Sequence, residues 1–139
     1  MTTRGLTIDQ LEPGRRHTAD VEVTDRMVRA FAEATGDRNP IHLDEEAARD
    51  TPFGRRIAHG LLTAGIVSGI LGMEFPGPGT VYVSQTLKFV RPVFLGDTVT
   101  IELEVMAVDR DRHRVTLATS CSTAAGPVLV GEAVVLPPR

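Results

Sequence analysis

The chain has 139 residues, of which 42% are hydrophobic and 24% charged, a composition typical of one soluble globular domain over residues 1–139. The formal net charge is −3 and the basic residues lie singly or in pairs, which excludes the concentrated basic face of a nucleic-acid-binding protein. Cys121 is the only cysteine, so no internal disulfide can form and a cytoplasmic location is expected. The most apolar stretch, 57–73, is too short and too interrupted by glycines to cross a membrane.

The first part of the chain predicts a strand and two helices. Residues 15–23 alternate loosely and are rich in β-branched residues, which indicates a short strand. Thr24 can cap a helix that stops at Gly36, and Asp44 can cap a shorter helix over 45–49. Between these two helices lies a polar loop that proline makes stiff.

A third helix is predicted over 60–71, and it contains no charged residue. A helix that is apolar all round should be buried on all sides. The rest of the chain has a period of two and predicts four strands, over 80–90, 98–109, 112–123 and 128–136. Short turn-like joints between them indicate an antiparallel meander.

In a chain of this length only the sheet can cover the apolar helix, so we expect an α+β architecture with a curled antiparallel sheet wrapped around it. One small sheet cannot enclose a helix completely, and it leaves strand edges and an apolar flank exposed. We therefore expect a homodimer.

The loop over 36–44, GDRNPIHLD, contains the best candidates for chemistry. Asp37 and His42 would lie on different faces of a helix, but on a turn stiffened by Asn39-Pro40 they can converge. A carboxylate and an imidazole at one point suit the addition of water to a double bond, which requires one proton to be removed and another delivered. The alternative roles are structural, since Asp37 could end a local turn and His42 could be a hydrogen-bonded buried histidine.

The start of the apolar helix is a second candidate, because the first N–H groups of a helix are free to stabilise negative charge. Gly60 would let a substrate carbonyl approach closely, whereas His59 is interpreted as structural. Ser68 is expected to be buried in mid-helix and, by itself, to bond its own helix backbone. No cluster has the spacing of metal ligands and no nucleotide-binding glycine motif is present, so neither a metal nor a cofactor is expected.

The loop GDRNPIHLD, followed by RIAHG over 56–60, resembles the hydratase signature of the MaoC-like (R)-specific enoyl-CoA hydratases. The similarity continues through 68–72 and Gly96-Asp97 and covers nearly the whole chain. It is greatest to the short bacterial form that supplies (R)-3-hydroxyacyl-CoA for polyhydroxyalkanoate synthesis.

This resemblance implies a hot-dog fold, a homodimer with a continuous sheet, and reversible syn hydration of trans-2-enoyl-CoA to (R)-3-hydroxyacyl-CoA without a cofactor. It makes Asp37 and His42 the catalytic pair and Gly60 the backbone donor to the thioester oxygen. It also places Ser68 near the catalytic pair, and Leu71 becomes a candidate for the wall of the acyl pocket. Four cations could meet the phosphates of the acyl-CoA substrate without any being assigned: Arg55, Arg56, Lys88 and Arg91.

Three other functions stay open. A 3-hydroxyacyl-[acyl carrier protein] dehydratase would use the same chemistry on another carrier. A thioesterase is a further alternative because one fold hosts several activities. The last alternative is a non-catalytic acyl-CoA-binding module. The acid–base pair Asp37 and His42 argues against it, because binding alone does not require groups placed for proton transfer.

Overall fold

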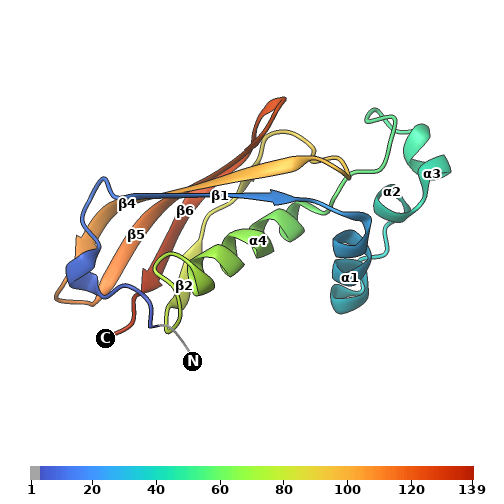
Figure 1. Ribbon diagram of the computed structural model, residues 1–139. Coiled ribbons are helices and arrows are strands. Elements are labelled where there is room, and N and C mark those ends of the chain that lie inside the picture. Colours follow the sequence, from blue (N-terminus) through green and yellow to red (C-terminus); the bar gives the residue numbers. More distant parts are fainter. Residues whose placement is uncertain (1–3) are drawn as a thin grey trace.

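The computed structural model describes residues 4–139 and contains one curled antiparallel sheet with helices on one side and beyond one end (Figure 1). The central helix α4 (Gly60–Met73) lies along the concave side of the sheet, and the three shorter helices gather near its first residue. These are α1 (Asp25–Thr35), α2 (Pro40–Leu43) and α3 (Glu45–Arg49). The predicted α+β class with a sheet curled over an apolar helix is confirmed.

The six strands run in the order β1-β4-β5-β6-β2, and β3 pairs with β6 beside β2. They are β1 (Arg16–Glu22), β2 (Val81–Gln85), β3 (Lys88–Phe89), β4 (Thr98–Asp109), β5 (Arg114–Thr123) and β6 (Gly126–Leu136). A 3₁₀ helix, η1 (Ile8–Gln10), precedes β1 and has no counterpart in the sequence-based prediction.

The predicted four-stranded meander is correct for β4, β5 and β6 and wrong for β2, which pairs with β6 at the far edge. The joint at Gly96-Asp97 is not a hairpin between β2 and β4. The backbone of this joint forms hydrogen bonds with Val23 instead: Gly96 N donates to Val23 O, and Val23 N donates to Asp97 O. The joint therefore aligns β4 with the first strand of the chain, and residues 90–97 carry the chain across the sheet.

The strand predicted over 80–90 is divided into β2 and β3. Both strands pair with β6, and the break between them lies opposite Gly131. A Cβ atom at Gly131 would lie only 1.9 Å from the carbonyl oxygen of Thr86. A glycine in a strand interior is typical of such a close backbone approach. The break brings Phe89 of β3 over the first residue of α4, where a Cβ on Gly60 would lie 2.7 Å from its ring.

The core lies between the sheet and α4. In β4 and β5 buried residues alternate with more exposed ones, as the period of two predicts. Burying each large aliphatic side chain stabilises the fold by about 1.5–3 kcal/mol. The fully buried ones in these two strands and α4 are Val99, Ile101, Leu103, Val105, Val115, Leu117, Val67 and Leu71.

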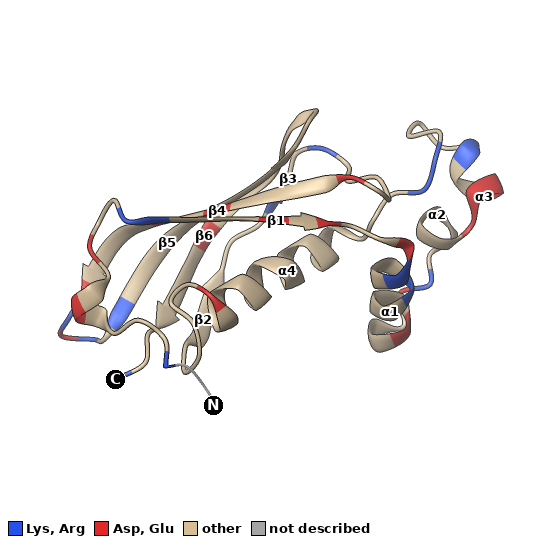
Figure 2. Ribbon diagram, in the orientation of Figure 1, with Lys and Arg blue, Asp and Glu red and all other residues tan. Residues whose placement is uncertain are grey.

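The prediction that α4 is buried on all sides is wrong for the single chain. Leu61 and Met73 are 57% and 72% exposed, although α4 bears no charged residue and is uniformly tan in Figure 2. The sheet covers one side of the helix, and the other side stays open. This is the exposed apolar flank from which a homodimer is expected.

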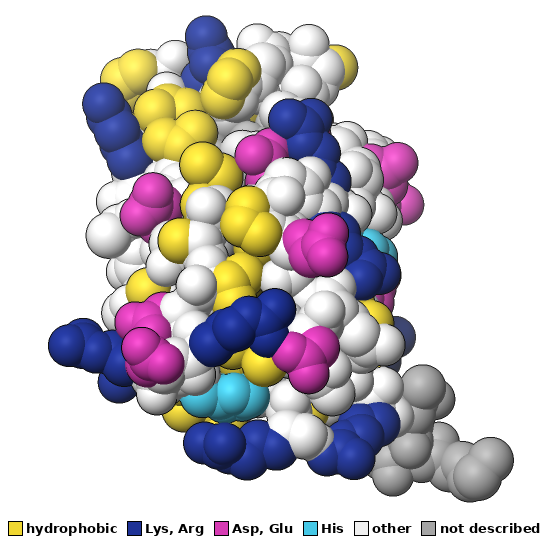
Figure 3. Space-filling model, turned by 90° about the vertical axis from the view of Figure 1, so that its left-hand side faces the viewer, with side chains coloured by type: hydrophobic (Ala, Val, Ile, Leu, Met, Phe, Trp, Pro, Cys, Tyr) yellow, Lys and Arg dark blue, Asp and Glu magenta, His cyan; other side chains and the backbone are white. Residues whose placement is uncertain are grey.

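Charged side chains of both signs are mixed on the face shown in Figure 3, and no block of one sign dominates it. Within residues 4–139, no helix combines the length and the apolar character that crossing a bilayer requires.

Candidate active site

The turn between α1 and α3 brings the first candidate residues together. Gly36 ends α1 in the left-handed conformation, with φ of 79°, which glycine adopts at little cost. Asn39 then accepts a hydrogen bond from Ile41 N and caps α2, whose first residue is Pro40. The segment predicted as a stiff loop therefore contains a one-turn helix, and that turn places His42 on its inner side, 8% exposed.

The His42 ring has a defined orientation. Its Nδ1 lies 2.7 Å from the carbonyl oxygen of Ile57, and because a carbonyl only accepts, Nδ1 bears the hydrogen. In the neutral ring Nε2 is then the free basic atom. Burial lowers the pKa of His42 below its ordinary value of 6.5, the Ile57 carbonyl opposes this shift, and His59 adds to it. His42 is therefore held in the neutral form that can accept a hydrogen bond or a proton.

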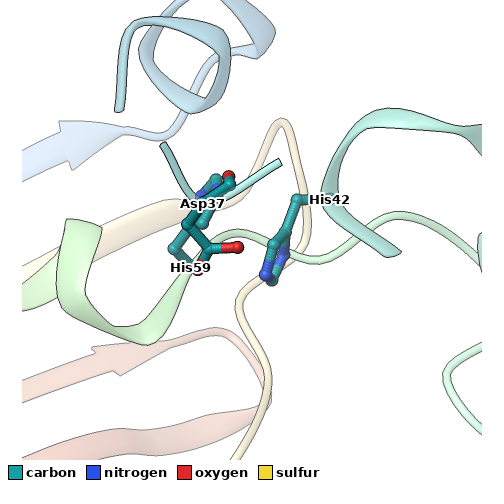
Figure 4. A group of neighbouring side chains, drawn as sticks. All are labelled: Asp37, His42 and His59. Atoms are coloured by element: carbon teal, nitrogen blue, oxygen red, sulfur yellow. The ribbon is translucent and has the colours of Figure 1, made fainter. Parts of the chain in front are cut away.

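Asp37 and His42 converge as the sequence predicts, and His59 joins them. One potential donor or ligand atom from each of the three lies within 4.8 Å of the other two. Figure 4 shows a carboxylate oxygen of Asp37 pointing toward the His42 ring. Asp37 is exposed at the surface of the turn, and its Oδ1 accepts a hydrogen bond from Asn39 N at 3.2 Å.

Two nitrogens and a carboxylate could serve as ligands of a divalent metal. In this site, however, one nitrogen of each ring is bound to a backbone carbonyl: His42 Nδ1 to Ile57 and His59 Nε2 to Asp37. The two rings are also in contact, with centroids 3.9 Å apart and planes tilted by 31°. The arrangement suits an acid–base pair supported by a second histidine, and the expectation that the site uses no metal stays a prediction.

A cavity of about 490 Å³ opens beside the pair and reaches the start of α4. Its wall is mainly apolar, with Asp37 and His42 among the few polar groups on it. Residues of the wall come from α1, the 53–63 segment, the strand-to-strand segment at 89–93 and β6; the apolar ones include Phe31, Phe53, Ile57, Leu61, Phe89, Val93 and Leu129. Such a pocket with few convergent polar groups is typical of a small-molecule site.

Gly60 lies on this cavity as predicted, and it is the first residue of α4. The N–H of a first helical residue has no partner within its own helix, so it can bind an oxygen of a ligand. The structure thus places a backbone donor, a carboxylate and a neutral imidazole around one space.

Two predicted site residues do not lie there. The expectation that Ser68 is buried is wrong, since Ser68 is exposed on the open flank of α4, and it is eight residues, about 12 Å, along the helix from Gly60. Leu71 is 2% exposed in the main core and does not belong to the cavity wall of its own chain. The helical period turns both side chains away from the cavity.

Arg56, one of the four cations considered for substrate phosphates, has a structural position instead. Its guanidinium is 8% exposed, and its Nε donates to the carbonyl oxygen of His42 at 2.7 Å while Nη2 donates to Asp25 Oδ1 at 2.6 Å. The Arg56 hydrogen bond, followed by that of Arg29, lowers the pKa of Asp25. Arg56 therefore ties α2 to α1, a role that no sequence motif identified.

Among the other cations, Arg91 lies on the cavity wall and Arg55 stacks over the Phe94 ring at 3.8 Å. Most apolar residues of the cavity wall, Phe31, Ile57 and Phe89 among them, were not predicted as site residues. The apolar face of α1 included Phe31, and Ile57 lies in the RIAHG motif, but neither signal gave these residues a place in a site.

The chain is similar to known hydratases and dehydratases of acyl-CoA thioesters. The chain is 50% identical over 136 residues to a 3-hydroxybutyryl-CoA dehydratase of Methylorubrum extorquens, which covers 98% of this chain and 87% of the relative. It is 43% identical over 131 residues to an (R)-specific enoyl-CoA hydratase of Aeromonas caviae, covering 94% of this chain and 98% of that one.

Two solved structures share the fold over almost the entire chain. The R-hydratase PhaJ1 from Pseudomonas aeruginosa, in its unliganded form, superposes with a TM-score of 0.94 at 39% identity and covers 100% of this chain and 90% of its own. The (R)-hydratase from A. caviae involved in PHA biosynthesis gives a TM-score of 0.89 at 43% identity and covers 92% of this chain and 98% of its own. The fold is thus the hot-dog fold that the sequence resemblance implied.

Residues 9–134 match the family described as "MaoC like domain". This range includes the Asp37–His42 turn, the start of α4 and all six strands except the last residues of β6. On this match and on these relatives, the chain belongs to the MaoC-like family.

Proposed function

We propose that the chain catalyses reversible syn hydration of trans-2-enoyl-CoA to (R)-3-hydroxyacyl-CoA, which makes it a hydro-lyase. The observation that carries this proposal is the position of the Asp37 carboxylate and the neutral His42 ring in an apolar cavity that also contains the free N–H of Gly60. The relatives named as hydratases and as a dehydratase add and remove water, which are the two directions of this one reaction.

In the reaction, the thioester oxygen accepts a hydrogen bond from Gly60 N–H, and the positive end of α4 stabilises the enolate that forms. Water lies between Asp37 and His42, where His42 Nε2 accepts a hydrogen bond from it and Asp37 takes a proton. The oxygen forms a bond to the β-carbon as the double bond breaks. Asp37 then gives its proton to the α-carbon from the same face, which leaves both catalytic groups in their starting forms.

Each step uses only acid–base chemistry and charge stabilisation by groups of this chain, so we expect no cofactor and no metal. We place the activity in the cytoplasm, in keeping with a single cysteine, Cys121, that is buried and unpaired among residues 4–139. The product is the (R)-3-hydroxyacyl thioester that polyhydroxyalkanoate synthesis consumes.

The test follows the loss of the conjugated-thioester absorbance of crotonyl-CoA, with chiral analysis of the product. Hydration to the (R)-3-hydroxy product supports the proposal, and release of free CoA would identify a thioesterase instead. Crotonyl-[acyl carrier protein], assayed in parallel at equal concentration, distinguishes the carrier: a dehydratase of carrier-protein substrates would prefer it strongly. Binding without turnover of either substrate would indicate a non-catalytic module.

Activity should persist below pH 6.5. The hydration step requires neutral His42, and burial lowers the pKa of this ring in the folded chain. The acid limb of kcat/KM against pH should therefore lie below the ordinary histidine value of 6.5. A limb at or above 6.5 would contradict the role of neutral His42.

The same shift affects stability. Because the folded pKa of His42 is depressed, the unfolded chain binds the proton more readily below pH 6.5, so the stabilisation present above 6.5 falls as the pH decreases. Urea unfolding at pH 7.5 and pH 5.5 measures the difference. His42→Gln should make the free energy of unfolding less dependent on pH over this range than it is in the wild type.

We further propose that a second copy covers the open flank of α4 and the edge strand β2, as the resemblance implies. Within residues 4–139, β2 pairs only with β6, and its residues Val81, Tyr82 and Val83 are all exposed. A shallow groove between α4 and β2 joins these strand residues to the helix flank. Strand edges and apolar flanks of this kind favour pairing with a like edge. Ser68 lies on the same flank, so its predicted place near a catalytic pair requires the second copy.

Val83→Arg should convert a dimer into a monomer, as measured by light scattering coupled to size-exclusion chromatography. Met106→Arg is the matched control, because Met106 is similarly exposed but lies on β4, away from this face. A wild-type chain that elutes as a monomer at micromolar concentration would contradict the proposal.

A further inference from the structure

The side chain of His59 contacts both residues of the proposed catalytic pair. It immediately precedes α4 and is 3% exposed, and its Nε2 lies 3.0 Å from the backbone carbonyl oxygen of Asp37. Because that oxygen only accepts, His59 Nε2 bears the hydrogen. Its Nδ1 is buried and has no hydrogen-bond partner within residues 4–139.

The His59 ring also lies against two other rings. Its centroid is 3.9 Å from that of His42 and 4.6 Å from that of Phe31, with planes inclined by 31° and 48°. The close contact with His59 restrains the His42 ring. The hydrogen bond from His42 Nδ1 to Ile57 O and this contact together hold the His42 ring beside Asp37, with both residues on the cavity wall.

All these restraints come from one short segment, residues 57–60. Ile57 O accepts from His42 Nδ1, and Ile57 N donates to Ile41 O at 3.4 Å on the same turn. His59 donates to Asp37 O and its ring contacts that of His42, and Gly60 provides the backbone donor at the start of α4. This segment is itself attached to the sheet, since Ala58 N donates to Val93 O at 2.7 Å.

We propose that His59 is a positioning residue for the hydration reaction. It sets the distance from the Asp37–His42 pair to the Gly60 N–H through its Nε2–H bond to Asp37 O and the contact of its ring with His42. This inference rests on the proposed function for its kinetic consequences but not for its structural ones. Its physical basis is that Asp37 lies on an exposed turn, and within residues 4–139 only His59 links its backbone to the 57–73 segment by a hydrogen bond. A displacement of about 1 Å between reacting groups can cost on the order of 10² in rate.

The kinetic test compares His59→Gln with His59→Asn. Both remove the ring and keep an amide, but only the glutamine amide reaches the position of Nε2 and can still donate to Asp37 O. We expect kcat to fall about 10²-fold in His59→Asn with KM nearly unchanged, and His59→Gln to recover about tenfold of that loss. His17→Asn is the matched control, because His17 is also stacked on an aromatic ring, Phe75, and bonded to a side chain, Glu74, far from the cavity.

Two results would overturn the proposal. One is equal kcat in the Gln and Asn variants; the other is a lower melting temperature with unchanged kcat per folded molecule, which is what a merely structural histidine gives. Ring ¹⁵N shifts of the wild-type chain provide a second measurement that depends on neither folding of a variant nor turnover. They should show hydrogen on Nε2 of His59 and on Nδ1 of His42, and hydrogen on Nδ1 of His59 instead would refute the proposed bond. If the wild type hydrates no enoyl thioester, the proposed function fails, while these shifts still decide the arrangement of His59.

Discussion

Replacing Asp37 by asparagine should lower kcat for hydration of crotonyl-CoA about 10²–10⁴-fold, the usual contribution of a positioned acid–base group. Asparagine has nearly the same shape, and its side-chain oxygen can still accept the bond from Asn39 N that now goes to Asp37 Oδ1 at 3.2 Å. The turn should therefore keep its conformation. What is lost is the ability to take a proton from water and return it to the α-carbon, so the deficit should appear in kcat rather than in binding.

Binding of the saturated analogue butyryl-CoA, measured by calorimetry, should be nearly the same in the variant and the wild type. Asp44→Asn is the control, because it makes the same chemical change seven residues later, at a carboxylate that caps α3 through Glu46 N and Ala47 N and is not on the cavity wall. It should lower stability by about 1 kcal/mol or less, since asparagine is itself a good cap, and leave kcat unchanged. Retention of kcat within a few-fold by Asp37→Asn would remove Asp37 from the reaction.

Much of the fold follows from local patterns in the sequence. Thr24 and Gly36 bound α1 as their capping chemistry predicts, and Thr24 does accept the bond from Met27 N. Asp44 caps α3 as expected. The convergence of Asp37 and His42 was also predictable, because Asn39 and Pro40 restrict the turn between them. The same two residues carry the signals for a helix cap and a first helical position, so the one-turn helix α2 could have been foreseen.

Strand order could not be read in the same way. Both edges of the β4-β5-β6 unit offer similar alternating faces, and the decision that β2 joins β6 depends on the path of residues 90–97 and on the close approach at Gly131. These are long-range contacts, to which a period of two is insensitive.

The same limit applies to the site. The cavity lies at the N-terminal end of α4, so residues further along this helix, Ser68 and Leu71, point to its open flank and to the core instead. Arg56 resembles any other arginine in sequence, and only the packing of α1 against α2 shows that it binds His42 O and Asp25. A helix whose sides face different environments cannot be assigned from its composition alone.

The role of the Gly60 N–H in stabilising the enolate can be tested with a proline at position 60, which has no N–H. Gly60 is the first residue of α4, a position that proline fits well because the N–H it lacks has no partner within the helix. The preceding residue, His59, has φ of −61° and ψ of 135°, which is the backbone conformation that a following proline requires. The obstacle is Phe89, whose ring would lie 2.7 Å from any Cβ at position 60. The experiment is therefore made in a Phe89→Ala background.

In that background Gly60→Ala and Gly60→Pro both add a Cβ, and they differ in whether residue 60 retains its N–H. If the N–H stabilises the enolate, the proline variant should have a kcat about 10²–10³-fold below that of the alanine variant, the usual cost of removing one such donor. Both should show the same helical circular dichroism, since neither change removes a bond within α4. Equal kcat in the two variants would mean that the thioester oxygen is stabilised elsewhere, and the start of α4 would then serve only to hold His59 against the catalytic pair.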